Sequence, residues 1–313
     1  MKGLVASAPG KLFLCGEYAV LEGAPAVLTA IDRRAVARVA AAARRTSPVV
    51  AAVLAEIGAR FPELEGADRA APPVEVRTRG FTRGRIKIGL GSSAAVAVAA
   101  TALLLARAKG SARLDDEAVL GVALAAHRAA QGGRGSGADV AAAVHGGTIR
   151  YRMGGAIERL GSPAAEIAFV WTGQPASTTE LLARVQAFAL EAPGEHRALL
   201  DALSALATDL AAAYAAPDPG EIVRLTGAYG GLMGRLGEAA GAPIVNPAHE
   251  RVAELAASCG GAGKPSGAGG GDVAMAVFAD PADRDRFASA AAKDGLAVLD
   301  LKCGERGVEV SGG

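Results

Sequence analysis

The stretch best suited to chemistry is Gly89-Leu90-Gly91-Ser92-Ser93-Ala94-Ala95, which directly precedes a long apolar segment. Glycines let backbone N–H groups turn toward a ligand, and the start of a helix adds unpaired donors and partial positive charge. The serine hydroxyls can reach a phosphate oxygen or a bound magnesium ion. These are the properties of a phosphate-binding loop, although the Gly-Lys-Ser/Thr ending of a P-loop is missing. An ordinary glycine turn with a serine cap explains the stretch equally well when it is considered alone.

A second glycine-rich stretch, Ser266-Gly267-Ala268-Gly269-Gly270-Gly271-Asp272, lies nearer the C-terminus. Fixing so many glycines costs much conformational entropy, so an ordered loop here needs a compensating contact. Close approach of the backbone to a ligand or to another loop supplies one. A flexible linker is the alternative, and it is disfavoured because a clear strand pattern over 273–278 follows at once.

Two further glycine-marked stretches carry charged side chains. Lys11 follows the turn Pro9-Gly10 and precedes an apolar strand, while Asp139 follows a glycine-rich run and precedes an alanine-rich one. Most lysines in proteins are solvated, and an aspartate at a helix start is commonly a cap. Each residue alone therefore favours a structural role, and the prediction of chemistry depends on the four stretches taken together.

The other patterns indicate the elements that must position these stretches. Helices are predicted over 51–57, 92–109, 115–130, 177–190, 195–215, 219–239 and 281–293, and strands within 3–39 and over 74–77, 168–171, 273–278 and 296–302. The helix over 92–109 is apolar nearly all round, which is typical of a helix buried in a core. This order of elements predicts an α+β fold, with a domain boundary shortly before the strand at 168.

Composition narrows the class of protein. The chain has 313 residues with a net charge of +1, which predicts one or two globular domains and no nucleic-acid partner. Three scattered cysteines and four histidines without a ligand spacing predict neither disulfides nor structural zinc. The apolar run 94–106 is too short for a bilayer, and the first residues lack the apolar core of a signal peptide. We therefore expect a cytoplasmic protein without a membrane partner.

Three of the stretches, taken in order, resemble the motifs of the GHMP kinase superfamily: Pro9-Gly10-Lys11, the central Gly89–Ala95 and Ser266–Asp272. The resemblance covers most of the chain, from Ser7 to about Phe278. It implies an N-terminal domain over 1–163 like the second domain of ribosomal protein S5, and a ferredoxin-like C-terminal domain over 164–313. It also implies that ATP binds the central motif, that Lys11 and Asp139 form the catalytic pair, and that Ser93 contacts Mg²⁺ or a phosphate.

Within the superfamily, several features resemble the phosphomevalonate kinases. Tyr18 stands where mevalonate kinases typically have histidine, Lys87 lies just ahead of the central glycines, and the runs 130–143, 171–173 and 176–178 are also similar. Where mevalonate kinases carry a magnesium-binding glutamate, this chain has Arg128 and Gln131. The resemblance implies ATP-dependent phosphorylation of phosphomevalonate. Mevalonate kinase is the main alternative; a related ATP-dependent decarboxylase and a non-catalytic GHMP-fold binding protein are less favoured.

The predicted site residues follow from the resemblance and from charge. ATP is expected to contact Lys87, Gly89, Leu90, Gly91, Ser92, Ser93 and Ala94. The anionic substrate is expected to contact Lys11, Tyr18, Arg134, Ser136, Gly137, Ser177, Thr178, Ser266, Gly267, Ala268 and Gly269. A phosphate acceptor is mostly a dianion at neutral pH, so its approach to ATP requires cations. Lys11, Lys87 and Arg134 are the main candidates, with Lys264 as a further one, whereas His127 and His145 are interpreted as structural. A monomer or a homodimer is expected.

Overall fold

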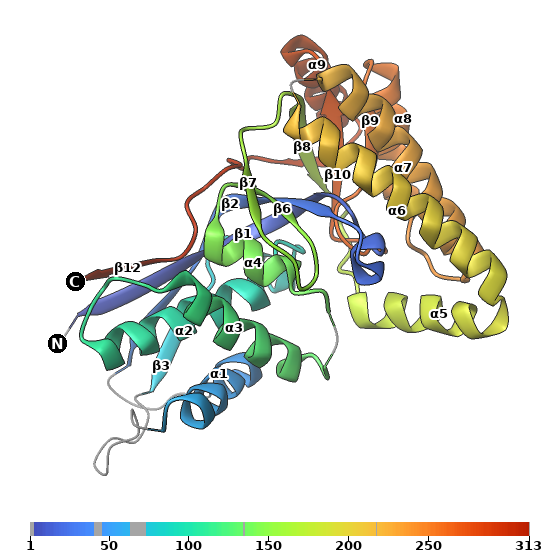
Figure 1. Ribbon diagram of the computed structural model, residues 1–313. Helices are drawn as coiled ribbons and strands as arrows, with labels where there is room; N and C mark the ends of the chain where they lie inside the picture. The colour runs from blue at the N-terminus through green and yellow to red at the C-terminus, as the bar shows by residue number, and fades with distance from the viewer. Residues whose placement is uncertain (1–2, 41–45, 63–72, 134, 217, 313) are drawn as a thin grey trace.

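The computed structural model describes residues 3–40, 46–62, 73–133, 135–216 and 218–312. In this part of the chain, two larger antiparallel sheets are each covered by helices, and a short two-stranded sheet accompanies them. The first sheet and helices α1 to α4 form one end of the molecule, and the later helices form the other (Figure 1). The α+β fold class predicted from the sequence is confirmed.

The first sheet has the strand order β12-β1-β2-β6-β7, with β3 paired to β2. Its strands are β1 (Leu4–Cys15), β2 (Ala26–Val39), β3 (Val74–Arg77), β6 (Thr148–Tyr151), β7 (Glu158–Leu160) and β12 (Glu309–Gly312). A short 3₁₀ helix, η1 (Ala19–Glu22), lies between β1 and β2, and the short hairpin β4 (Thr82–Arg83) and β5 (Ile86–Lys87) leads into the central glycine loop. The register between β1 and β2 shifts at Pro9 and Gly10, so β1 is irregular beside Lys11.

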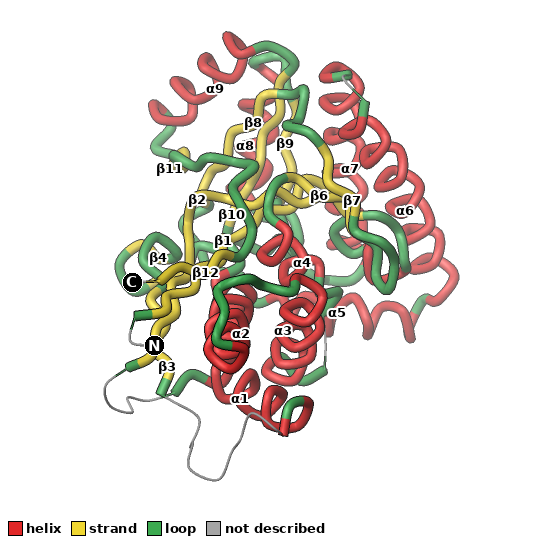
Figure 2. Tube along the Cα trace, turned by 60° about the vertical axis from the view of Figure 1, so that its left-hand side comes forward, coloured by secondary structure: helices red, strands yellow, loops and turns green. Residues whose placement is uncertain are grey.

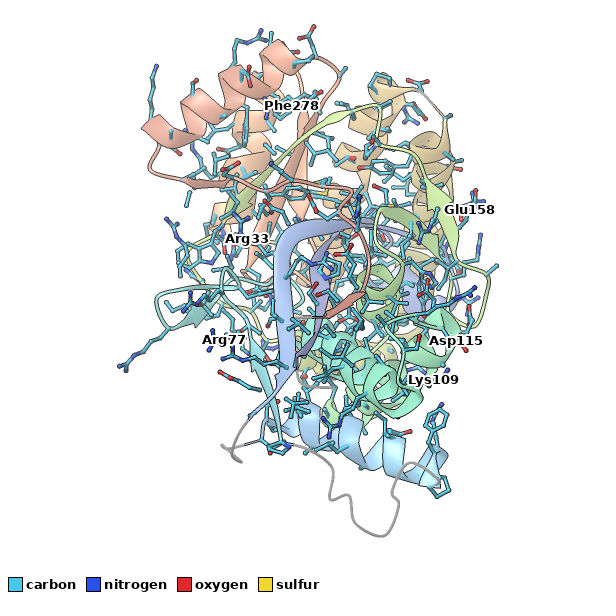
Figure 3. All side chains as sticks on the ribbon, turned by 90° about the vertical axis from the view of Figure 1, so that its left-hand side faces the viewer. Arg33, Arg77, Lys109, Asp115, Glu158 and Phe278 are labelled. Carbon is cyan, nitrogen blue, oxygen red and sulfur yellow. The ribbon has the colours of Figure 1, made fainter. Side chains whose placement is uncertain are left out.

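Four helices cover this sheet: α1 (Pro48–Arg60), α2 (Ser92–Lys109), α3 (Asp116–Ala130) and α4 (Ala138–His145). Helix α2 packs on β1 and β2, and α3 lies beside it (Figure 2). Helix α2 has the predicted bounds, and it stops before Gly110, which is in the left-handed conformation with φ of 64°. Its last residue is Lys109, and Asp115 caps the start of α3 through the Ala118 N–H; Figure 3 labels both residues. The loop before α2 is therefore attached to a buried, rigid helix.

The second sheet has the order β11-β8-β10-β9. Its strands are β8 (Glu166–Trp171), β9 (Ala262–Pro265), β10 (Val273–Phe278) and β11 (Ala297–Leu299), and the helices around it are α5 (Thr178–Glu191), α6 (Pro193–Ala215), α7 (Pro219–Ala239), α8 (Pro247–Ser258) and α9 (Pro281–Lys293). Every residue of β10 is buried, and Phe278 at its end contacts Phe287 of α9 (Figure 3 labels Phe278). The C-terminal glycine loop thus leads into a central, fully buried strand.

Helix α8 was not predicted, although its start carries clear signals. The Asn246 side chain accepts a hydrogen bond from the backbone of His249, and Pro247 occupies the first turn. Burial of Val252 and Ala256 holds the helix in the core beside the second sheet. The opposite face of this short helix is polar, so α8 is amphipathic, and both this pattern and the cap could have indicated it.

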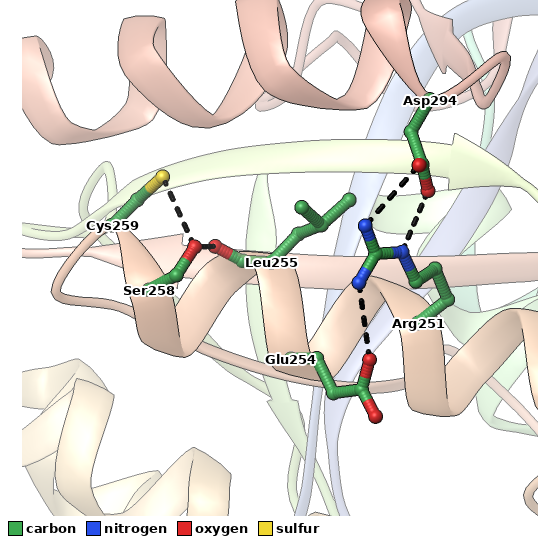
Figure 4. A network of polar contacts seen from close by, with 6 residues as sticks. All are labelled: Arg251, Glu254, Leu255, Ser258, Cys259 and Asp294. Atoms are coloured by element: carbon green, nitrogen blue, oxygen red, sulfur yellow. Dashed lines mark hydrogen bonds and ion pairs between the residues drawn. The ribbon is translucent and has the colours of Figure 1, made fainter.

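The exposed face of α8 carries a small polar network (Figure 4). Arg251 donates two hydrogen bonds to Asp294, at 2.7 and 3.1 Å, and one to Glu254 at 3.2 Å. At the helix end, the Ser258 hydroxyl donates to the Leu255 carbonyl at 2.8 Å. Exposed ion pairs contribute about 1 kcal/mol or less, so this network tethers α8 to the end of α9 without dominating stability.

Strand β12 was not predicted either, and it brings the end of the described chain back to the first sheet. It pairs antiparallel with β1, with Leu4 opposite Gly312, so the two ends of the described chain lie side by side (Figure 1). A single hydrophobic core also contains residues of both halves, such as Leu103 and Met275. The division into domains over 1–163 and 164–313 remains a proposal. Because β12 pairs with β1, the last strand of the described chain lies in the first sheet, although its residues fall within the second range.

Two helices of the described chain, α2 and α6, are long and apolar enough to cross a membrane by length and composition. The apolar run 94–106 is shorter than a membrane span, but the whole of α2, at 18 residues, is long enough. In the structure, α2 packs on β1 and β2, and its residues Ala97 to Ala102 are all buried. Such burial is that of a core helix, as the sequence pattern predicts.

Candidate active site

A cavity of about 430 Å³ lies where the four glycine-marked stretches meet. Thirteen predicted site residues line it: Lys11, Tyr18, Lys87, Gly89, Leu90, Gly91, Ser92, Ser93, Ser136, Asp139, Thr178, Gly267 and Ala268. They come from β1, from β5 and the glycine loop after it, from the segments before η1 and α4, from the first turns of α2, α4 and α5, and from the C-terminal glycine loop. Stretches that are distant in the sequence therefore form one cavity.

The central loop packs directly on β1. The Lys11 N–H donates to the Leu90 carbonyl at 3.0 Å, and a Cβ on Gly10 would lie only 2.5 Å from that carbonyl oxygen. Gly91 precedes α2 in the left-handed conformation with φ of 75°, and the Lys11 side chain covers it. No described side chain caps α2, so its first N–H groups stay available at the cavity, where Ser92 and Ser93 lie.

Asp139 lies in the first turn of α4, which Gly137 begins with φ of 83°. A Cβ on Gly137 would come within 2.4 Å of Leu124 Cδ1, so another residue here would have to displace the Leu124 side chain as well as adopt the left-handed conformation. Asp139 Oδ2 lies 3.8 Å from Nε2 of His127, which is 3.0 Å from Ser93 Oγ. The structure thus brings the predicted metal contact and the predicted catalytic carboxylate to one histidine.

The Lys264 ammonium forms a buried ion pair with Glu17. The same Glu17 oxygen accepts a hydrogen bond from the Gly267 N–H at 3.2 Å, and the Tyr229 hydroxyl donates to the Glu17 carbonyl at 2.7 Å. The expectation that Lys264 adds free positive charge for the substrate is wrong, because Glu17 neutralises that charge. Burial, with a smaller effect of the Glu17 charge, raises the pKa of the Cys15 thiol to about 12, so Cys15 stays protonated.

Tyr18 has an unusual backbone conformation at the cavity wall. Its φ is 61°, which is uncommon for a residue with a side chain, and its hydroxyl donates to the Ala268 carbonyl at 2.6 Å. Burial raises the pKa of Tyr18, and the nearby Glu17 carboxylate raises it further. Tyr18 therefore remains a neutral donor that ties the segment before η1 to the C-terminal glycine loop.

Asp272 also has positive φ, at 56°, and its carboxylate lines the cavity. Its Oδ1 accepts a hydrogen bond from the Ala176 N–H at 3.3 Å, and its own N–H donates to the Gln174 carbonyl at 2.7 Å. Gly89 packs against it so closely that a Cβ there would lie 2.4 Å from Asp272 Cβ. Burial raises the pKa of Asp272, while the Ala176 N–H and the Lys11 charge act in the opposite direction.

Five predicted residues lie outside the cavity lining and have structural contacts. Ala94 is buried in the core, Gly137 begins α4, Ser177 caps α5 through the Glu180 N–H, Ser266 donates to the Phe13 carbonyl at 2.8 Å, and Gly269 packs on the Ile244 carbonyl. Arg134 lies outside the described residues. Binding roles for these six residues remain predictions.

The cavity also contains residues that the sequence analysis did not assign to the site, among them Phe13, Glu17, Gln131 and Asp272. Lys11 Nζ lies 4.8 Å from the centre of the Phe13 ring, within the range of a cation–π interaction. Asp272 had a sequence signal, because it ends the glycine run and is its one acidic residue. Phe13 had none beyond its place in an apolar strand.

Comparison with known proteins agrees with this geometry. The model of the GHMP kinases N terminal domain matches residues 49–147, and the model of the GHMP kinases C terminal domain matches residues 210–296. A phosphomevalonate kinase of Streptomyces sp. (strain CL190) is 27% identical over 90% of this chain and 91% of its own length.

Two solved structures share the fold along nearly the whole chain. The Lin0012 protein of Listeria innocua has a TM-score of 0.87 at 24% identity and is covered in full, as is this chain. The Streptococcus pneumoniae phosphomevalonate kinase in complex with phosphomevalonate and AMPPNP has a TM-score of 0.80 at 19% identity, over 96% of this chain and 99% of that one. Since both family models match in order and together span more than half of the residues, the chain belongs to the GHMP kinases.

Proposed function

We propose that this kinase transfers the γ-phosphoryl group of ATP to phosphomevalonate, which gives diphosphomevalonate and ADP in the mevalonate pathway of isoprenoid synthesis. The observation that carries the proposal is the gathering of Lys11, Ser93, Asp139 and the Gly267 loop around one cavity. The curated relative named phosphomevalonate kinase, which aligns with 90% of this chain, supports the choice of acceptor.

The start of α2 suits the triphosphate of ATP. Its first N–H groups are uncapped, and the glycines before it leave room for close approach. Lys87 lies beside them at the cavity, where its charge would attract a phosphate. We assign the nucleotide to this side, with its phosphates toward Ser92 and Ser93.

The donor set also fits Mg²⁺. The described residues contain no cluster of three or more His, Cys, Asp or Glu side chains that could hold a metal ion. Mg²⁺ in kinases is bound by one or two protein oxygens together with substrate phosphates, so such a cluster is not required. Ser93 Oγ and the Asp139 carboxylate supply oxygens of this kind at the cavity. Bound there, Mg²⁺ would neutralise charge on the phosphates.

Transfer between two phosphates depends on alignment and on neutralised charge. The acceptor phosphate is already mostly a dianion near pH 7, with a second pKa of about 6, so little proton removal is needed. We assign to the Lys11 ammonium the contact with donor and acceptor oxygens, and to Asp139 the orientation of Lys11 and the acceptor. Ser136 and Thr178, which line the cavity, are assigned to the acceptor's polar groups.

The proposal extends to the setting of the reaction. We place the enzyme in the cytoplasm, acting on a small anionic substrate, as a monomer or a homodimer. Mevalonate is the competing acceptor, because a hydroxyl near Asp139 would find a carboxylate able to accept its proton. The decarboxylase and the non-catalytic binding protein stay less favoured. A decarboxylase would release carbon dioxide, and a non-catalytic protein would release no ADP.

One experiment separates these candidates. ADP release is measured with ATP and either phosphomevalonate or mevalonate, each titrated to saturation, with carbon dioxide release followed in parallel on mevalonate diphosphate. The proposal predicts a kcat/KM for phosphomevalonate at least a hundredfold above that for mevalonate, without release of carbon dioxide. Preference for mevalonate, carbon dioxide production, or no ADP release with any acceptor would contradict it.

A further inference from the structure

His127 of α3 lies under the cavity and contacts two of its polar side chains through one nitrogen. Its side chain is buried, and its Nε2 lies 3.0 Å from Ser93 Oγ and 3.1 Å from Gln131 Nε2. Asp139 Oδ2 is 3.8 Å from the same atom. Ser93, Gln131 and Asp139 line the cavity, whereas His127 does not.

The orientation of the Gln131 amide sets the direction of these contacts. Its nitrogen faces the ring and can only donate, so Nε2 accepts from it and carries no proton. The Ser93 hydroxyl then donates to the same lone pair of Nε2, which the two donors share. Both lone pairs of the Ser93 oxygen are left on the side away from the ring, where they can face a metal ion or a hydrogen-bond donor in the cavity.

We propose that His127 is a positioning residue that holds the Ser93 hydroxyl with its lone pairs toward the cavity. The inference rests on the proposed function only in giving Ser93 the contact with Mg²⁺ or a nucleotide phosphate. Without His127, the hydroxyl would rotate among its staggered positions, and its oxygen would bind less well. A residue that hydrogen-bonds to a metal ligand orients that ligand, and its substitution typically lowers metal affinity or activity 10-fold to 100-fold.

Two substitutions of His127 test the role of its Nε2 atom. In His127→Gln, the side-chain amide reaches about the position of Nε2, so it can still accept from Ser93. In His127→Asn, the amide stops about one bond short and loses the contact. His127→Leu fills the buried space without a hydrogen bond, and it replaces the asparagine variant should that variant not fold. His145→Gln, on a partly buried histidine at the far end of α4 from Asp139, is the matched control.

The readout is binding of AMPPNP by calorimetry, with Mg²⁺ and with EDTA, so that no acceptor is needed. We expect His127→Asn and His127→Leu to weaken Mg-dependent binding about 10-fold to 100-fold, with His127→Gln and His145→Gln within about threefold of wild type. With EDTA, all variants should bind about equally. Equal binding by His127→Asn, His127→Leu and wild type in Mg²⁺, or an equal loss in EDTA, would overturn the proposal.

A double-mutant cycle with Ser93→Ala completes the test. If His127 acts through Ser93, adding His127→Asn or His127→Leu to Ser93→Ala should cause no further loss of Mg-dependent binding. Losses that multiply would show that His127 acts by another route and would overturn the proposal. Because these measurements omit the acceptor, a failure of the phosphomevalonate assignment leaves them intact.

Discussion

Lys264 and Glu17 form a buried ion pair between residues 247 positions apart in the chain. The pair joins the segment before η1 to the strand that leads into the C-terminal glycine loop. It also places a Glu17 oxygen where the Gly267 N–H donates to it at 3.2 Å. The two sides of the cavity are therefore attached to each other beneath its surface.

Removing one member of this pair should be strongly destabilising. Lys264→Met leaves the Glu17 carboxylate buried without its cation, and the loss of one partner of a buried pair typically costs about 3–5 kcal/mol. Urea unfolding monitored by circular dichroism measures the free energy of unfolding. The double variant Glu17→Gln with Lys264→Met should recover part of the loss. A single variant as stable as wild type would show that the pair is dispensable.

Gly89→Ala should disturb the cavity more than a comparable change elsewhere. Its Cβ would lie 2.4 Å from Asp272 Cβ, and its φ of 78° disfavours any side chain. We expect at least a tenfold loss of kcat/KM for ATP. Gly84→Ala is the control, because Gly84 has φ of 59° with nothing within 4 Å of a new Cβ. It carries the same backbone strain of about 1–2 kcal/mol without the collision. Equal kinetic losses in both variants would assign the effect to strain alone.

Asp272→Asn should raise stability at pH 7 and lower activity. Because burial raises the folded-state pKa of Asp272 above 3.8, the native state holds its proton more tightly than the unfolded state does. The stability that this proton uptake contributes is therefore complete at pH values below the pKa of Asp272 in the unfolded state. It is lost as the pH rises through the pKa of Asp272 in the folded state. Asparagine removes that penalty and tolerates positive φ. The Tm of the variant should exceed that of wild type at pH 7, with a smaller gap near pH 3.5. A lower Tm at pH 7 would mean that the attraction of Lys11 outweighs burial.

His249 should make the protein less stable in mild acid. Burial lowers its pKa from 6.5 to about 4, so the native state binds fewer protons than the unfolded state between these values. The contribution of His249 to the free energy of unfolding is therefore complete above pH 6.5 and decreases as the pH falls toward 4. In His249→Gln, glutamine keeps the capping box of α8 but does not titrate. The difference in unfolding free energy between pH 7 and pH 5 should shrink in this variant, and an unchanged difference would exclude His249 as its source.

Local signals predicted the long helices and the motifs, but they missed α4, α8, β9 and β12. The bounds of α2, with Gly110 as its stop, and the order of the glycine stretches followed from residue type and spacing. Contacts between distant side chains did not. Nothing near Lys264 in the sequence indicates that Glu17 neutralises it, and the apolar surroundings of His127 gave no hint of Ser93. Strand β12 was missed for the same reason, since it is a strand only because β1 offers it an edge.

The most direct test of the account is the turnover of Lys11→Ala and Asp139→Asn on ATP and phosphomevalonate, with AMPPNP affinity measured on the same samples. Lys11 and Asp139 lie at one cavity with the nucleotide loop, so each change should remove charge or orientation needed at the point of transfer. We predict that kcat falls at least about a hundredfold in each variant, and by a larger factor than AMPPNP affinity does. Near-normal kcat in both variants would contradict the assignment of this cavity as the site of phosphoryl transfer.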